Sequence, residues 1–193
     1  MRKLALALLA FFVGWIPLAG ATDLGRPLIL VAKPELHDKM YGATVLIVTP
    51  LSGGQHAGFI INRPTGTTLG ELFPQHGPSQ KVPDPVFLGG PIQTRAIFAL
   101  VQRPDSPGGN SFEMMPGLFA AFDAAIVDRI IETDPMHARF VAGLVAWQAG
   151  ELGQEIKQGA WYVLEPDGAL LMRNPDGLWE DLVRRCARIN GTI

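Results

Sequence analysis

Short apolar segments, each bounded by glycine, proline or polar residues, recur along most of the chain. Apolar runs of about four to eight residues with many β-branched side chains are typical of buried strands. The segments that predict strands are 28–32, 43–49, 58–63, 86–88, 96–101, 112–115, 139–147 and, joined as a hairpin across 166–168, 160–164 and 169–172. Their number predicts a sheet built mainly from antiparallel strands.

Helix signals are fewer, and two of them have a recognisable start. Thr68 can cap a brief helix because Glu71 stands at the capping-box position. Asp123 can cap a second helix, in which apolar residues recur at core spacing. The predicted helices span 69–73, 124–132, 151–158 and 178–189. Strand runs interrupted by few helices, without repeats or linkers, indicate a single α+β domain.

The segment 58–64, Gly-Phe-Ile-Ile-Asn-Arg-Pro, is the strand around which the rest of the chain is organised. Proline has no amide hydrogen for the strand ladder and forces the preceding residue into an extended conformation, so the strand is expected to stop at Arg63. Asn62 and Arg63 would then lie on stiff backbone at a strand exit, where polar contacts are well fixed. Further on, Gly89 and Gly90 permit positive φ and close backbone approach.

The first 21 residues have the pattern of an export signal. Arg2 and Lys3 precede an apolar stretch at 4–16, and small residues at 19–21 form a cleavage site. The alternative is a retained membrane anchor, but the stretch is shorter than the roughly 20 residues that a spanning helix needs. We therefore expect cleavage near Ala21 and a mature domain at 22–193, periplasmic or secreted and free of the membrane.

Charge and cysteine content limit the function classes. Removing Arg2 and Lys3 from 16 basic residues leaves 14 against 18 acidic residues, a formal net charge of −4. Binding of nucleic acid is not expected, since it requires a basic surface. The single Cys186 cannot form an internal disulfide, and its place in the helix predicted at 178–189 favours a small buried residue over a reactive thiol.

No catalytic, phosphate-binding or metal-binding motif is present, so no catalytic residue, metal or cofactor is predicted. The histidines are scattered among predicted loops and are expected at the surface; they are His37, His56, His76 and His137. Whether the protein is an enzyme is left open, with a non-enzymatic role preferred. An enzyme would need an unrecognised arrangement, for example one built from His37, Asp38 and Arg63.

The polar residues that best suit a binding site are Asn62 and Arg63, with Asp38 as a third member. In the structural interpretation, Arg63 pairs with a carboxylate such as Asp38 or Glu155, and Asn62 caps a loop. In the functional interpretation, Arg63 holds an anionic ligand or the carboxylate of a partner through its planar guanidinium. The structural interpretation is preferred, because buried polar pairs usually organise folds.

Several blocks of the sequence together resemble the YqgE/AlgH family. The resemblance covers roughly residues 27–187 and rests on blocks in the family's order, at 31–38, 58–64, 88–91, 116–118, 147–155 and 159–161. It implies a compact α+β domain whose strongly bent sheet folds into a pseudo-barrel with helices around it. The family is described as one of transcriptional regulators, although no DNA-binding motif or catalytic set is agreed for it.

Two features depart from the family. The block Gly-Trp-Gly-x-Gly-Gln-Leu reads Ala-Trp-Gln-Ala-Gly-Glu-Leu at 146–152, which leaves Trp147 as a candidate that either flanks a pocket or fills the core. Family members are generally cytoplasmic, whereas this chain carries an export signal. The sequence therefore predicts an exported module that binds an unknown protein or small molecule. The alternatives are a cytoplasmic regulator and a small enzyme.

Overall fold

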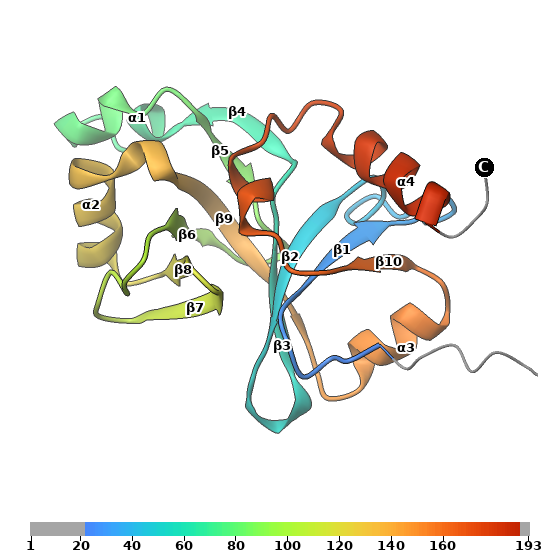
Figure 1. The fold of residues 1–193 in the computed structure, drawn as a ribbon. Coiled ribbons are helices and arrows are strands. Elements are labelled where there is room, and N and C mark those ends of the chain that lie inside the picture. Colours follow the sequence, from blue (N-terminus) through green and yellow to red (C-terminus); the bar gives the residue numbers. More distant parts are fainter. Residues whose placement is uncertain (1–21, 190–193) are drawn as a thin grey trace, which may run out of the picture.

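The computed structural model describes residues 22–189 and shows a strongly curled sheet, a half-barrel, with helices around its outside (Figure 1). The strands are β1 (Leu28–Ala32), β2 (Val45–Pro50), β3 (His56–Ile60), β4 (Pro64–Thr68), β5 (Pro85–Leu88), β6 (Ile92–Gln102), β7 (Ser111–Met115), β8 (Leu118–Ala121), β9 (Ala138–Trp147) and β10 (Trp161–Leu164). The helices are α1 (Leu69–Leu72), α2 (Ala124–Thr133), α3 (Glu151–Lys157) and α4 (Leu178–Ile189), and short 3₁₀ turns lie at η1 (Ser52–Gly54), η2 (Gly77–Lys81), η3 (Pro135–His137) and η4 (Gly168–Met172). The predicted α+β class with a bent, mainly antiparallel sheet is confirmed.

β9 is the strand that joins the two halves of the sheet. The strand order is β10-β1-β2-β3-β9-β6-β8-β7, and β4 pairs with β5 beside this path. The end of β9 pairs with β3, its first two-thirds pair with β6, and β5 lies parallel to it at Val141 and Ala142. Three strands therefore take their position from β9.

Glycines make this meeting of strands possible. A β-carbon on Gly90 would lie 2.2 Å from the carbonyl carbon of Leu144, and one on Gly143 would lie 2.4 Å from the Gly90 oxygen. Gly89 bridges the halves, since its amide donates to Ala142 and its carbonyl accepts from Ile60, both at 2.8 Å. The close approach predicted for Gly89 and Gly90 is confirmed, but the positive φ lies at Gly143, at 76°.

Apolar residues gather in three clusters. The first fills the hollow of the half-barrel around Phe59 and Leu100 and includes Leu178 and Leu182 of α4, and the third lies under α3. The second lies between α2 and the sheet, where the buried face of α2 meets β6, β8 and β9. It ends in the partly buried Ile97 and Ala142, so this cluster is open at one side.

The helix starts agree with the sequence. Thr68 and Glu71 form the predicted capping box, and the hydrogen bond from the Thr68 amide lowers the pKa of the Glu71 carboxyl. Asp123 accepts a hydrogen bond from the Ala125 amide at the start of α2. Cys186 is buried in α4, as expected, and burial raises the pKa of its thiol.

Three strand predictions were wrong or incomplete. Residues 168–172 form η4 rather than the second strand of a hairpin, because Asp167 caps this turn and Leu170 and Leu171 both point into the core. β3 ends at Ile60 rather than at Arg63, and Pro64 begins β4, a position at which proline is tolerated because no ladder donor is needed. β8 was not predicted, since its four residues follow a turn directly.

We predict that Gly143→Ala destabilises the protein by about 2–5 kcal/mol, since it adds a strained left-handed conformation to a backbone clash. Gly77→Ala is the control, because its β-carbon would meet no atom within 4 Å. Its effect should stay within about 0.5 kcal/mol. Equilibrium urea unfolding measures both changes, and equal midpoints for the two variants would contradict the crossing described above.

Candidate functional site

The strand exit after β3 is held by its own side chains. The Asn62 side chain accepts a hydrogen bond from the Val45 amide at 2.8 Å and donates to the Ala43 carbonyl at 3.0 Å. It thus continues the ladder between β3 and β2 by one step, opposite Ala43, whose φ is +56°. The side-chain amide of Asn62 thus takes the place of a backbone hydrogen-bond partner, which the chain cannot supply where it leaves the ladder.

Arg63 binds backbone carbonyls rather than a carboxylate. Its guanidinium donates to Met40 at 2.6 Å and to Gly42 at 3.2 Å, and so holds the loop before β2 against the exit. The expected pairing with Asp38 or Glu155 was wrong. Asp38 accepts from the amides of its own loop, and the Glu155 carboxylate accepts from two indole nitrogens instead.

Trp147 lies in the core and shares a carboxylate with a second tryptophan. The indole nitrogens of Trp147 and Trp161 donate to the same oxygen of Glu155, at 3.0 and 2.8 Å. Both rings are 4% exposed, and Glu155 comes from α3. This contact holds α3 against the sheet. Of the three glycines in the family's version of the block 146–152, this chain keeps Gly150, which begins α3 with a φ of 85°.

Arg139 is a buried polar residue that the sequence analysis overlooked. It is 6% exposed, donates to the Ile61 and Arg173 carbonyls at 2.8 and 3.0 Å, and lies over the Phe87 ring. Burial lowers the pKa of this guanidinium to about 10, against the smaller opposing effect of the Asp84 carboxylate. The sequence signal that could have revealed it is an arginine within the apolar run that forms β9.

The histidines do not gather in one place. His56 is buried rather than at the surface, because its ring contacts the Leu24 carbonyl at 2.9 Å and so holds the segment before β1. Among residues 22–189 no group of three or more histidine, cysteine, aspartate or glutamate side chains could hold a metal ion. Within the same range, none of the helices combines the length and the apolar character required to cross a membrane.

An apolar groove lies at the open side of the second cluster. It consists of two adjoining hollows of about 440 and 430 Å³, whose walls share Phe73, Arg95 and Ile97. We call it the α1–α2 groove. The first hollow is lined further by residues of α2 and by Phe122, and the second by residues of β4, β5 and β9.

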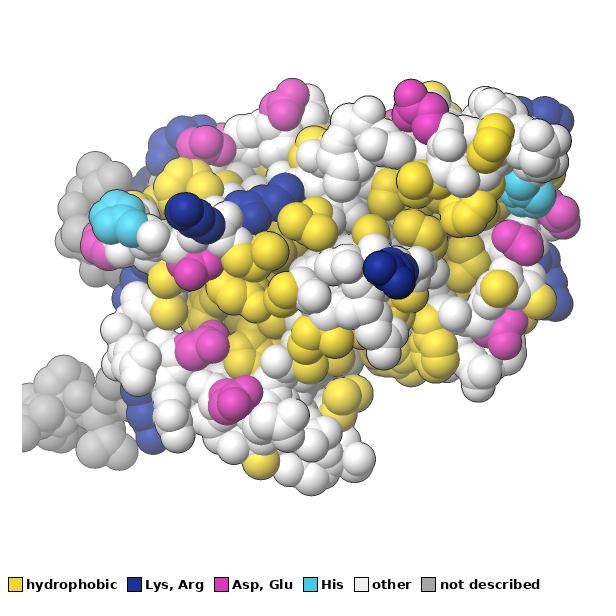
Figure 2. Space-filling model, turned by 180° about the vertical axis from the view of Figure 1, so that it is seen from behind, with side chains coloured by type: hydrophobic (Ala, Val, Ile, Leu, Met, Phe, Trp, Pro, Cys, Tyr) yellow, Lys and Arg dark blue, Asp and Glu magenta, His cyan; other side chains and the backbone are white. Residues whose placement is uncertain are grey.

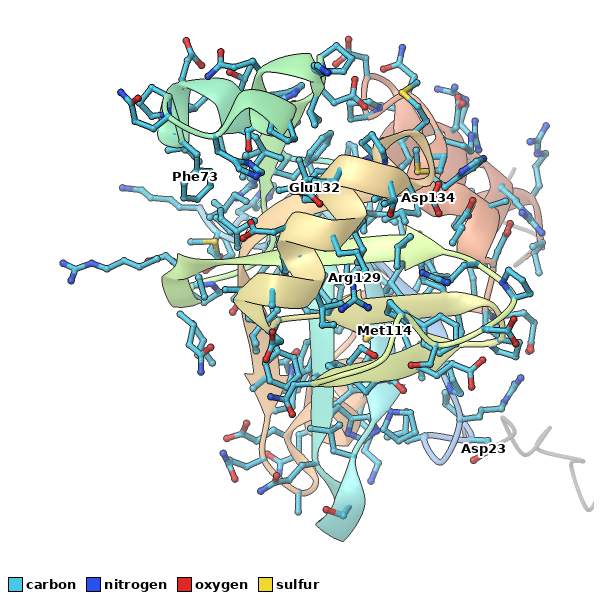
Figure 3. All side chains as sticks on the ribbon, turned by 90° about the vertical axis from the view of Figure 1, so that its left-hand side faces the viewer. Asp23, Phe73, Met114, Arg129, Glu132 and Asp134 are labelled. Atoms are coloured by element: carbon cyan, nitrogen blue, oxygen red, sulfur yellow. The ribbon has the colours of Figure 1, made fainter. Side chains whose placement is uncertain are left out.

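The groove exposes more aromatic surface than a core face would. Phe73 and Phe122 are 43% and 48% exposed, and Leu72 beside them is 45% exposed. Figure 3 shows Phe73 below α1, on the side where α2 and β6 lie. Figure 2 shows hydrophobic side chains on its right-hand part, the side that carries α1 and α2, as well as over the middle and left of this face. Sequence reasoning missed this groove because its walls come from segments far apart in the chain.

Comparison with known proteins agrees with this fold. The family model described as AlgH-like matches residues 29–189. The chain belongs to the AlgH-like family. A UPF0301 protein of Thermobifida fusca is 31% identical over 167 residues, which is 81% of this chain and 84% of the relative. A UPF0301 protein of Chlorobium phaeobacteroides is 29% identical over 160 residues, 81% of this chain and 83% of the relative.

Two solved structures share the fold of this AlgH-like protein. The AlgH protein from Pseudomonas aeruginosa superposes with a TM-score of 0.69 at 24% identity, covering 90% of this chain and 93% of that one. A protein from Corynebacterium diphtheriae gives a TM-score of 0.68 at 20% identity, over 83% and 86% of the two chains. At these identities the likeness concerns the fold alone.

The contacts of the strand exit predict a structural role for Arg63 and Asn62. Arg63→Ala should destabilise the AlgH-like domain by about 2–3 kcal/mol, because the Met40 and Gly42 carbonyls lose the charged donor that holds their loop. Asn62→Ala should cost about 1–3 kcal/mol, since it leaves the buried Val45 amide unpaired. Thermal and urea unfolding measure both.

Arg129→Ala, on the exposed side of α2, serves as the control and should change stability by less than about 0.5 kcal/mol. If Arg63→Ala and Asn62→Ala melt like the control, the exit is not structural. A ligand role for Asn62, Arg63 and Asp38 would then become the better prediction.

Proposed function

We propose that this AlgH-like protein is an exported binding module, without catalysis of its own, that captures a small molecule with a sizeable apolar part in the α1–α2 groove. The main support for this proposal is the exposed apolar surface of the groove. Its exposed phenyl rings stand beside the second cluster, and hollows of this size fall within the roughly 300–1,000 Å³ typical of ligand sites.

The binding residues predicted from the sequence are less suited to a ligand, because their polar groups already have partners inside the protein. The donors of Arg63 and Asn62 are taken by carbonyls of the loop before β2, and Trp147 is buried against Glu155. The phenyl rings of Phe73 and Phe122 in the groove are, by contrast, partly exposed. Burial of a phenylalanine side chain contributes about 1.5–3 kcal/mol, and nearly half of that surface is still exposed on Phe73 and Phe122.

The export half of the proposal rests on the first 21 residues and on where the fold begins. The charged and apolar pattern at 2–16 and the small residues at 19–21 form the signal, and they lie outside the described residues. Leu24 packs against the third cluster and holds His56, while Arg26 pairs with Glu165. Cleavage near Ala21 would therefore leave Leu24 and Arg26, with these contacts, in the mature protein.

Export predicts that residues 1–25, fused to a reporter active only outside the cytoplasm, give a signal. Amino-terminal sequencing of the mature protein should begin at Thr22 or within a residue or two of it. Replacing Arg2 and Lys3 by glutamate removes the positive start of the signal and should abolish the reporter activity. A product that retains Met1 and fractionates with the cytosol would overturn the export half of the proposal and favour a cytoplasmic regulator.

Capture in the groove predicts saturable binding of an uncharged apolar dye such as Nile red to the folded protein. Phe73→Ser should weaken this binding by about fivefold, because roughly half a phenyl ring of contact is lost. Met136→Ser is the matched control, since Met136 is 69% exposed and lines neither hollow. Equal affinities for the two variants, or fluorescence that never saturates, would show that the groove binds nothing specifically.

A further inference from the structure

The second hollow of the α1–α2 groove lies between two irregular strand segments. On one side the pairing of β4 with β5 shifts between Pro64 and Thr68, around Gly66 with its φ of 74°. On the other side β6 leaves its register with β9 between Ile92 and Ile97. Bulges of this kind redirect side chains and are frequent beside binding sites.

The β6 bulge carries backbone strain. Gln93 adopts a φ of +55°, a conformation that residues other than glycine rarely take. The segment after it presents Thr94 and Arg95 to the groove, and the β4 bulge presents Thr65 and Thr67. Strain of this kind persists where the surrounding structure fixes it and is found often at ligand sites.

Arg95 has no acidic partner within the part of the chain that the structure describes. None of the ion pairs among residues 22–189 involves it, although it lines both hollows and is exposed. Thr65 donates its hydroxyl to the Val86 carbonyl at 2.7 Å, whereas no hydrogen bond is formed there by the hydroxyls of Thr67 and Thr94. The second hollow therefore offers a guanidinium and two hydroxyl donors, and no carboxylate lines it.

The first hollow has the opposite character. It is lined chiefly by apolar side chains; these are Phe73, Ala96, Ile97, Phe122, Ala124, Val127 and Ile131. Its polar groups are His76, Arg95 and Asp128. The Asp128 carboxylate on α2 would repel an anion from this end and so favours the second hollow for a negative charge.

On these grounds we propose that the groove takes a long-chain carboxylate. The carboxylate pairs with Arg95 and accepts hydrogen bonds from Thr67 and Thr94 in the second hollow. The alkyl chain crosses Phe73 and Ile97 into the first hollow. This inference deepens the proposed function and rests on it, because it names the ligand class for the same groove.

Calorimetric titration with decanoate, decan-1-ol and decyltrimethylammonium tests the proposal, with the two ionic compounds below their micellar concentrations and the alcohol below its solubility limit. Decanoate should bind at least about tenfold more tightly than the alcohol, and the cation more weakly than either. Lengthening the carboxylate from octanoate to decanoate should tighten binding by up to about fourfold for each methylene.

Variants identify the residues involved. Arg95→Gln should weaken decanoate binding at least about tenfold and leave the alcohol nearly unaffected, because only the charged head contacts the guanidinium. Thr67→Val keeps the β-branched shape and should have a smaller effect of the same kind. Arg129→Gln, an exposed arginine of α2 that lines neither hollow, should bind decanoate like the parent. Since Arg95 and Arg129 are both exposed, the variants should keep the parent's melting temperature.

The outcomes separate this inference from the proposed function. Equal binding of the three decyl compounds, or decanoate binding that Arg95→Gln leaves unchanged, would overturn the carboxylate proposal while apolar capture stands. Saturable Nile red binding without any binding of decanoate would do the same. If neither the dye nor decanoate binds, both proposals fail together.

Discussion

The fold depends on the close crossing of two glycine segments, Gly89–Gly90 and Gly143. Only glycine permits the backbones to meet there, since β-carbons would lie 2.2–2.4 Å from the facing atoms. The crossing lets β5 pass along one edge of β9 while β6 pairs with the other. A larger residue at either position would strain the pairing of β9 with one of its neighbours and destabilise the join between the two halves of the sheet.

The same crossing creates the groove. Ile92 is paired with Leu144 and Ile97 with Ala142, so five residue steps along β6 face two along β9. The three surplus residues cannot remain in the ladder and bulge outward, which turns Thr94 and Arg95 toward β4. The structural constraint on the sheet thus places a cation beside an apolar hollow that α1 and α2 leave partly open.

Polar groups elsewhere in the centre serve the fold. Ile61 donates to Val45 and accepts from Arg139, and the next two side chains bind the loop before β2. The buried guanidinium of Arg139 contacts two carbonyls and a phenyl ring rather than a carboxylate, and burial lowers its pKa. These contacts fix where β3 ends and β4 begins, and so hold one wall of the groove.

Local patterns were sufficient for the parts of the fold that local interactions decide. The capping box at Thr68, the start of α2 at Asp123, the buried run of β9 and the family resemblance could all be predicted. The η4 turn at 168–172 was instead predicted as the second strand of a hairpin, because its continuous apolar run fits a buried strand as well as a 3₁₀ turn with two buried leucines. The fixed polar contacts of Asn62 and Arg63 could be predicted, but their partners could not, since every residue has a backbone carbonyl and no sequence pattern marks the ones that are bound. The groove was missed for a related reason: bulges arise from register between distant strands.

We propose that ligands bind in the α1–α2 groove, whereas Asn62 and Arg63 after β3 have a structural role. Chemical-shift mapping with ¹⁵N-labelled protein and decanoate tests it most directly, because every backbone amide reports at once. If decanoate binds in the groove, the largest shifts fall at Thr67, Phe73, Thr94, Arg95 and Phe122, with little change at residues 38–42 and 62–63. Shifts centred on Asn62, Arg63 and the loop at 38–42, with the groove unchanged, would contradict it.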